Sequence, residues 1–198
     1  MNITRILFSF VIGVLFGTIP FSYLLGIIKG VDLKKTGSGN IGATNLGRSL
    51  GIVYFIIGFM LDGLKGLVPV LIAQHCDFIP GFAGAGAILA HIFNPIFAFK
   101  GGKGVSTTIG VALGIVPKPF LISIIVWLII YLTTFFVSLA SISLAIVLPV
   151  TTFLVGDTGT SERILILIIG ILIIFSHRSN IKRLFNKTEP KTFFWGKK

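Results

Sequence analysis

Charged residues and cysteines are scarce in this sequence, and each scarcity excludes a class of protein. Only 12% of the 198 residues are charged, whereas soluble domains average about 25%. Because 54% of the residues are hydrophobic and the mean hydropathy is +1.01, we interpret the chain as an integral membrane protein. The single cysteine, Cys76, excludes a disulfide framework within one chain and a metal cluster of several cysteines. We expect neither a metal nor a cofactor.

The sequence also lacks a recognisable cleavable signal peptide. Arg5 is followed by a long apolar run without the small-residue pattern of a cleavage site, so this run is predicted to remain as the first membrane span. Hydrocarbon about 30 Å thick requires about 20 residues of apolar helix. Apolar segments occur at residues 3–28, 52–73, 78–99, 105–116, 120–136, 139–155 and 164–176. They predict an all-α bundle of seven transmembrane helices, although the short fourth segment leaves open whether it crosses completely.

Basic residues are distributed unevenly among the connecting segments. With seven spans, most of the 17 basic residues fall on one side of the membrane. They are Lys29, Lys34, Lys35, Arg48, Lys100, Lys103, Arg178, Lys182, Arg183, Lys187, Lys191, Lys197 and Lys198. The positive-inside rule therefore predicts an amino terminus outside the cell and a carboxyl terminus in the cytoplasm. The same clustering argues against nucleic acid as a partner and suits a lipid bilayer and anionic small molecules.

Residues 34–51, KKTGSGNIGATNLGRSLG, form a glycine-rich polar run on the predicted cytoplasmic side. Gly37, Gly39 and Gly42 match the G-x-G-x-x-G spacing of a dinucleotide fold, but a membrane span and two lysines precede them instead of a strand. A Walker loop is not indicated either, since its Gly-Lys-Ser/Thr ending is missing. What remains is that glycines permit left-handed backbone, in which consecutive N–H groups converge on an anion.

Polar side chains accompany these glycines. Ser38, Asn40, Thr44 and Asn45 add hydrogen-bond donors. Arg48 adds a planar guanidinium, which matches the geometry of a phosphate group. We therefore interpret the segment as a phosphate-binding loop, with an ordinary interhelical connection as the alternative.

A second glycine-rich run, KGGKG at residues 100–104, lies at the next cytoplasmic junction. Gly101, Gly102 and Gly104 are expected to open a helix whose first N–H groups face an anion, with Lys103 as a mobile charge. The alternative is a positively charged anchor at the lipid surface. His91 precedes this run, and a packing role is favoured for it over a catalytic one.

Two pairs of polar residues follow at helical spacing. Ser138 and Ser141 stand at i and i+3, which suits a substrate contact, a helix cap or close helix packing. His177 and Asn180 are also about one turn apart, at the predicted cytoplasmic end of the last span. A histidine beside an amide can donate to an oxyanion or transfer a proton.

Two further charged features fit a membrane protein. Asp62 and Lys65 are three residues apart within a span, where an ion pair facing the bundle interior is expected because isolated charges in hydrocarbon are costly. The tail is basic and aromatic, which indicates an interfacial anchor. Its aromatic residues are Phe185, Phe193, Phe194 and Trp195.

Two anion sites on one face of a membrane bundle indicate two phosphates, and the lipid-soluble body indicates a substrate with an acyl chain. Acyl transfer to or from a phosphate-bearing molecule fits this combination. The rival is an organophosphate transporter. A transporter is expected to carry polar residues halfway through its spans and an internal repeat, whereas these spans are nearly pure Ile, Leu, Val, Phe and Gly and show no convincing repeat.

Three runs of the sequence resemble the signature motifs of the bacterial membrane-embedded glycerol-3-phosphate acyltransferases, the PlsY family. They are GSGNIGATNLGRSLG at residues 37–51, HIFNPIFAFKGGKGVSTT at 91–108 and HRSNIKRLFNKTE at 177–189. Since the resemblance covers almost the whole chain, it implies one acyltransferase domain, residues 1–198, in the inner membrane of a bacterium, with its active site facing the cytoplasm. It also implies seven spans with an extracytoplasmic amino terminus, in agreement with the charge distribution.

The resemblance implies acyl transfer from acyl phosphate to the 1-hydroxyl of sn-glycerol 3-phosphate, giving lysophosphatidic acid and phosphate, the first step of phospholipid synthesis. The residues that it implies for activity are Ser38, Arg48, the glycines and lysine of KGGKG, His177 and Asn180, whereas Glu189 is implied to be structural. Because acyl phosphate is already activated, we predict direct attack by the glycerol hydroxyl. The enzyme is expected to be a monomer. His177 is the expected base or oxyanion donor, the departing phosphate is the alternative base, and an acyl-enzyme on Ser38 is the competing mechanism.

Overall fold

The structure is a computed structural model that describes residues 2–193, and this part of the chain contains helices and connecting loops but no strand. The helices are α1 (Ile3–Thr18), α2 (Phe21–Ile28), α3 (Ala43–Leu50), α4 (Ile52–His75), α5 (Pro80–Ile92), the 3₁₀ turn η1 (Pro95–Phe97), α6 (Val105–Ile115), α7 (Pro117–Thr134), α8 (Val137–Val155), α9 (Thr160–Ser176) and α10 (Arg178–Phe185). An all-helical fold was predicted, and it is confirmed.

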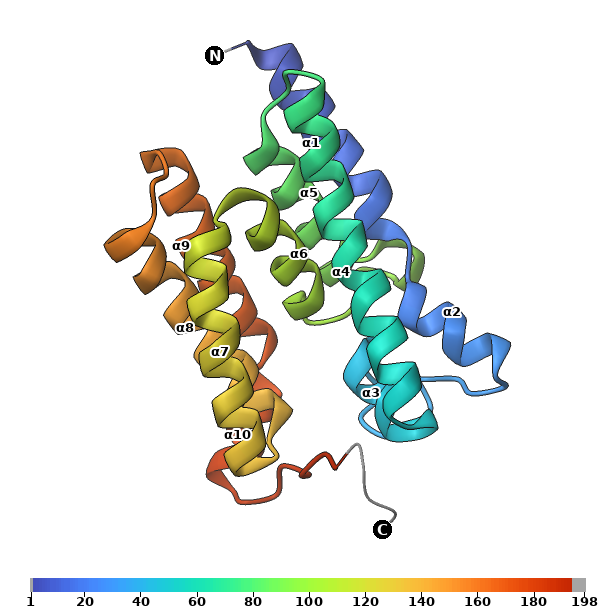
Figure 1. Cartoon of the computed structure of the whole chain (residues 1–198). Helices are drawn as coiled ribbons and strands as arrows, with labels where there is room; N and C mark the ends of the chain where they lie inside the picture. The colour runs from blue at the N-terminus through green and yellow to red at the C-terminus, as the bar shows by residue number, and fades with distance from the viewer. Residues whose placement is uncertain (1, 194–198) are drawn as a thin grey trace. The chain divides into compact units, whose positions relative to one another are not determined.

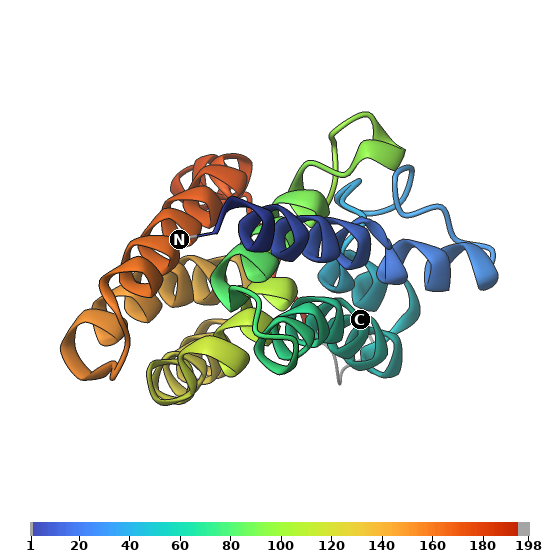
Figure 2. The same cartoon turned by 90° about the horizontal axis from the view of Figure 1, so that it is seen from above.

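The helices group into two compact units, which meet in the chain at Gly114 and Ile115. In unit 1, residues 2–114, α1, α4 and α5 run side by side, and α2 and α3 pack against α4 (Figures 1 and 2). In unit 2, residues 115–193, α8 lies against both α7 and α9, and α10 continues from α9. Each of the two glycine-rich runs belongs to unit 1, whereas the paired serines and the histidine–amide pair belong to unit 2.

Glycines bring the backbones of unit 1 close together. A Cβ atom at Gly13 of α1 would overlap the carbonyl group of Ala83 in α5, and one at Gly17 would overlap that of Ala87. A similar contact occurs between α4 and α6, where a Cβ atom at Gly66 would overlap the carbonyl oxygen of Thr107. Helices in a membrane associate through such small residues because apolar side chains gain little by leaving lipid.

Five helical segments are long and apolar enough to cross a membrane, and up to six if the bent pair α9–α10 is counted as one span. Each of the seven predicted segments contains a helix, but α6 has only 11 residues and α9 only 17. The predicted number of seven spans therefore stays a prediction. The first segment was predicted as one span, and it is one by length, but Ile19 and Pro20 divide it into α1 and α2.

Candidate active site

The first glycine-rich run folds into a loop that leads into a short helix, α3. Gly37 and Gly39 have φ angles of +59° and +71°, the left-handed conformation that was expected of these glycines. Gly42 has a φ of −89° and precedes the first residue of α3. The sequence prediction missed α3, although Ala43 and Leu46, three residues apart and both buried, give its apolar face the spacing of a helix.

Asn45 fixes the shape of this loop. Its side chain is buried, with a residue exposure of 1%. Its amide nitrogen donates to the carbonyl oxygens of Leu33, Thr36 and Asn40 at 3.0, 2.9 and 2.9 Å, and its amide oxygen accepts from the N–H group of Ser38 at 2.9 Å. The hydrogen-bonding groups of Asn45 are thus used to organise the loop, although the sequence had suggested this amide as a ligand donor.

The remaining polar residues of the loop are more accessible. Ser38 is exposed, and Asn40, Thr44 and Arg48 are partly exposed. The side chain of Asn40 accepts a hydrogen bond from the N–H group of Gly42 at 3.0 Å, which forms a local Asx turn. The loop therefore presents a hydroxyl group, a guanidinium group and glycine backbone on a frame that Asn45 holds.

The second glycine-rich run is held against the end of α5. The N–H group of Gly101 donates to the carbonyl oxygen of Ile92 at 2.9 Å, and the N–H group of Gly102 donates to the backbone carbonyl oxygen of His91 at 3.1 Å. A Cβ atom at Gly102 would overlap the imidazole ring of His91, so this ring packs directly on the loop. His91 is buried, and the packing role that the sequence favoured for it agrees with this position.

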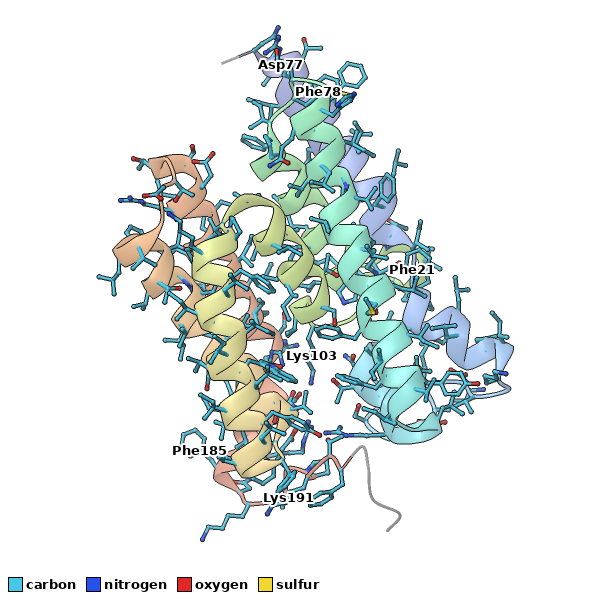
Figure 3. The ribbon with its side chains drawn as sticks, viewed as in Figure 1. Phe21, Asp77, Phe78, Lys103, Phe185 and Lys191 are labelled. Carbon is cyan, nitrogen blue, oxygen red and sulfur yellow. The ribbon has the colours of Figure 1, made fainter. Side chains whose placement is uncertain are left out.

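Helix α6 begins immediately after the glycines, at Val105. Gly104 has a φ of +85°, which turns the chain into the helix at low cost because glycine has no Cβ atom. Lys103 lies at this turn, two positions before Val105, the first residue of α6 (Figure 3). The expectation that this run opens a helix is therefore confirmed.

Lys34, at the start of the first glycine-rich run, contacts the segment that precedes the second run. The ring of Phe97, in η1, packs edge-on against Tyr23 of α2 with ring centroids 4.8 Å apart. The ammonium group of Lys34, in the first loop, lies 5.1 Å from the centroid of the same ring, a cation–π geometry. The first run thus contacts a residue that lies three positions before Lys100, where the second run begins.

In unit 2, His177 stands at the bend between α9 and α10. The two helices form an angle of 56°, and His177 at the junction is buried, with an exposure of 2%. Its Nδ1 atom lies 2.8 Å from the carbonyl oxygen of Ile173. A carbonyl oxygen only accepts, so Nδ1 carries the proton of this hydrogen bond. In the neutral ring the other nitrogen, Nε2, is then the basic one.

Asn180 and Glu189 form a buried pair close to this bend. The amide nitrogen of Asn180 donates to Glu189 at 2.7 Å, and Arg183 donates to the same carboxylate at 2.6 Å. Burial opposes the ionisation of Glu189, but these hydrogen bonds outweigh it and hold the pKa of Glu189 below its ordinary value. Since the ionised carboxylate only accepts, the amide oxygen of Asn180 is turned away from Glu189. The structural role that the resemblance implied for Glu189 agrees with these contacts.

The paired serines both lie in the first turns of α8. The hydroxyl group of Ser141 donates to the carbonyl oxygen of Val137 at 2.8 Å and accepts from the indole N–H of Trp127 at 3.4 Å, so this group serves helix packing. Ser138 is buried, and its hydroxyl group contributes to lowering the pKa of Glu189. Of the alternatives for these serines, packing is thus supported for Ser141.

The tail runs back across the junction between α7 and α8. The hydroxyl group of Tyr131 donates to the carbonyl oxygen of Thr192 at 3.0 Å, and the N–H group of Thr192 donates to Phe135 at 2.9 Å. Phe185 and Lys191 are exposed at this end of unit 2 (Figure 3). Phe194 and Trp195, which belong to the predicted anchor, lie outside the described residues.

The helices and loops define a membrane-embedded protein with glycine-rich loops at helix ends and a hydrogen-bonded histidine. The chain belongs to the glycerol-3-phosphate acyltransferase family, the PlsY family, whose model matches residues 7–187.

Individual relatives and solved structures agree with this assignment. The chain is 41% identical to a glycerol-3-phosphate acyltransferase of Aquifex aeolicus, covering 94% of this chain and 99% of the relative, and 41% identical to one of Bacillus subtilis, covering 91% and 94%. It is also similar to the crystal structure of PlsY in its glycerol 3-phosphate form, with a TM-score of 0.89 at 40% identity over 94% of each chain. The lysophosphatidic acid form of that protein gives a TM-score of 0.87.

Proposed function

We propose that this protein transfers a fatty acyl group from acyl phosphate to the 1-hydroxyl of sn-glycerol 3-phosphate, giving lysophosphatidic acid and inorganic phosphate. The observation that carries the proposal is that unit 1 holds two glycine-rich, cation-bearing loops, and that Lys34 of the first contacts Phe97 just before the second, since donor and acceptor each bring a phosphate group. The proposal is supported by the similar protein of known structure, which is described in a glycerol 3-phosphate form and a lysophosphatidic acid form.

The reaction needs no covalent intermediate with the protein. The 1-hydroxyl oxygen attacks the carbonyl carbon of acyl phosphate, the new ester bond forms, and the bond from that carbon to the phosphate oxygen breaks. The hydroxyl proton passes to the Nε2 atom of His177 or to the departing phosphate. Because phosphate is a good leaving group, the protein has mainly to position the two substrates and to stabilise the oxyanion.

In unit 1 we assign binding of phosphate groups to both loops. The first offers the hydroxyl group of Ser38, the guanidinium group of Arg48 and the backbone around Gly37 and Gly39. Asn40 and Thr44 support this loop, and Asn45 determines its shape through the four hydrogen bonds described above.

The second loop offers Lys103 and the N–H groups at the start of α6, where the helix dipole favours an anion. Gly101 and Gly102 hold this loop against α5, and Gly104 turns the chain into α6. Lys103 provides a point charge that follows a phosphate group more freely than a fixed backbone donor.

In unit 2 we assign proton transfer to His177, because the hydrogen bond of Nδ1 to Ile173 leaves Nε2 as the basic nitrogen. We assign hydroxyl binding to the amide oxygen of Asn180, which the hydrogen bond to Glu189 turns away from that carboxylate. Ser138 and Ser141 support this arrangement at the start of α8.

The same proposal includes the position of the protein in the cell. We propose seven spans in the inner membrane of a bacterium, with the amino terminus outside and both glycine-rich loops in the cytoplasm, where glycerol 3-phosphate is available. We further propose that the whole chain acts as one domain and as a monomer. The orientation is tested with Asn2→Cys and Asn40→Cys, each made in a Cys76→Ala variant and treated with an impermeant thiol reagent in intact cells. The reagent should label position 2, which is proposed to lie outside, and not position 40.

Purified protein in detergent, mixed with acyl phosphate and glycerol 3-phosphate, tests the reaction. Release of phosphate that requires both substrates is the expected result. No release, together with uptake of glycerol 3-phosphate into proteoliposomes, would establish the transporter instead. Rapid mixing with acyl phosphate alone tests the mechanism, because an acyl group trapped on Ser38 would contradict direct transfer.

A further inference from the structure

The break between α1 and α2 lies at the centre of a polar network inside unit 1. Pro20 has no N–H group, and the helix stops at Thr18 and resumes at Phe21, so the carbonyl groups before the proline lose their partners within the helix. In a membrane such groups must be paired by other side chains. The side-chain amide of Asn94 donates to the carbonyl oxygen of Thr18 at 2.8 Å, and the ammonium group of Lys65 donates to that of Ile19 at 2.7 Å.

Lys65 is itself held by a buried partner. Its Nζ atom lies 3.0 Å from the carboxylate of Asp62, and the two side chains are 0% and 2% exposed. The other carboxylate oxygen of Asp62 accepts from the hydroxyl group of Ser22, in α2, at 2.5 Å. A buried ion pair of this kind persists only when further hydrogen bonds satisfy both charges, and here those bonds run to both sides of the helix break.

Both glycine-rich loops are anchored at this network. The first loop leaves the end of α2, where the side chain of Leu33 packs against Gly26, and Ser22 joins the same helix to Asp62. Asn94 precedes the second loop: its side chain bridges Thr18 and the N–H group of Ile96, and a Cβ atom at Gly101 of KGGKG would crowd the Cβ atom of Asn94. A shift at the helix break would therefore move both loops.

We infer that Asp62, Lys65 and Asn94 are positioning residues, which fasten the α1–α2 break and thereby hold the two glycine-rich loops in register for binding two phosphate groups. This inference rests on the proposed function for its catalytic consequence, but its structural part concerns the loops alone. None of the three residues is required to touch a substrate. Their contribution is to keep the loop backbone in one conformation.

The test uses two variants of the full-length protein in detergent. Asn94→Leu removes the donor to Thr18 while keeping the branched shape of the side chain. Asp62→Asn combined with Lys65→Met removes the donor to Ile19 without leaving an unpaired buried charge. We expect the KM for glycerol 3-phosphate to rise and kcat/KM to fall on the order of 10- to 100-fold, because small displacements of binding groups are costly. Hydrogen exchange of residues 31–42 and 91–104 should become faster in both variants.

The matched control is Arg5→Gln with Asp77→Asn. This ion pair, 2.8 Å long and exposed, also lies in unit 1 but at the end where α1 begins (Figure 3), and its loss should leave KM and loop exchange unchanged. A merely structural network would lower the melting temperature while KM and loop exchange stayed at the control values, and that result would overturn the inference. Hydrogen exchange can be measured without turnover. If the wild-type protein proved inactive, the proposed function would be refuted, but hydrogen exchange of the variants would still decide the inference.

Discussion

The Nδ1 atom of His177 lies 2.8 Å from the carbonyl oxygen of Ile173, one helical turn earlier. This hydrogen bond fixes the orientation of the ring and the position of its proton, so that Nε2 is the nitrogen that can accept a proton from a hydroxyl group. The backbone of α9 thereby takes the place of the carboxylate that often orients a catalytic histidine. The assignment of His177 as a base depends on this contact.

Two substitutions of His177 distinguish the roles of its two ring nitrogens. His177→Asn can retain a donor to Ile173 but loses Nε2, and His177→Ala loses both. If Nε2 accepts the proton, kcat should fall by about 100-fold or more in both variants. Near-normal turnover of His177→Ala at saturating substrates would show that the departing phosphate, and not His177, accepts the proton.

Asn45→Ala should disorder the first loop. The substitution leaves three carbonyl groups and one N–H group without the partner that they share. The carbonyl group of Leu33 is in a buried hydrogen bond, and an unpaired buried group costs about 1–3 kcal/mol. We expect a lower melting temperature and a raised KM for at least one substrate. Ser49→Ala is the control, because Ser49 donates only to the backbone of its own helix at 3.0 Å. Equal kinetics for the two variants would show that the loop does not depend on Asn45.

Gly102→Ala should abolish most of the activity. The added methyl group would overlap the imidazole ring of the buried His91, so the KGGKG loop must move away from α5. Gly63→Ala is a matched control in the same unit, because its nearest neighbour, the carbonyl oxygen of Ser106, is at an ordinary 3.5 Å. Steady-state kinetics of both variants, with melting temperatures, check the prediction. Comparable activity of Gly102→Ala and Gly63→Ala would mean that the contact with His91 is not required.

The stability of unit 2 should depend on pH through Glu189. Hydrogen bonds lower the pKa of this carboxyl group from its ordinary value of 4.5, so its ionised form stabilises the folded state above that pH and the contribution is lost as pH falls through the lowered pKa. Glu189→Gln removes the charge but keeps the shape. Wild type should therefore melt at a higher temperature than Glu189→Gln at pH 7, and the difference should shrink on titration below about pH 4.5. A difference that is independent of pH would contradict this account.

Several features followed directly from the sequence. Long apolar runs fixed the helical membrane fold, since lipid leaves backbone groups no partner outside the helix. The left-handed Gly37 and Gly39 and the helix start after Gly104 also followed, because these depend on the local backbone preference of glycine. The ion pair of Asp62 and Lys65 was expected for a similar reason, as three residues of helix place both charges on one face.

Other features were decided only by the tertiary structure. The role of Asn45 as the organiser of its loop, and the capping of the α1–α2 break by Lys65 and Asn94, depend on carbonyl groups that other parts of the chain bring within reach. Asn94 meets Thr18 across 76 positions in sequence, and Lys65 meets Ile19 across 46. Sequence periodicity reports which face of a helix is apolar, but it carries no information on which distant backbone groups lack a partner. In a membrane that requirement determines where the buried polar side chains point.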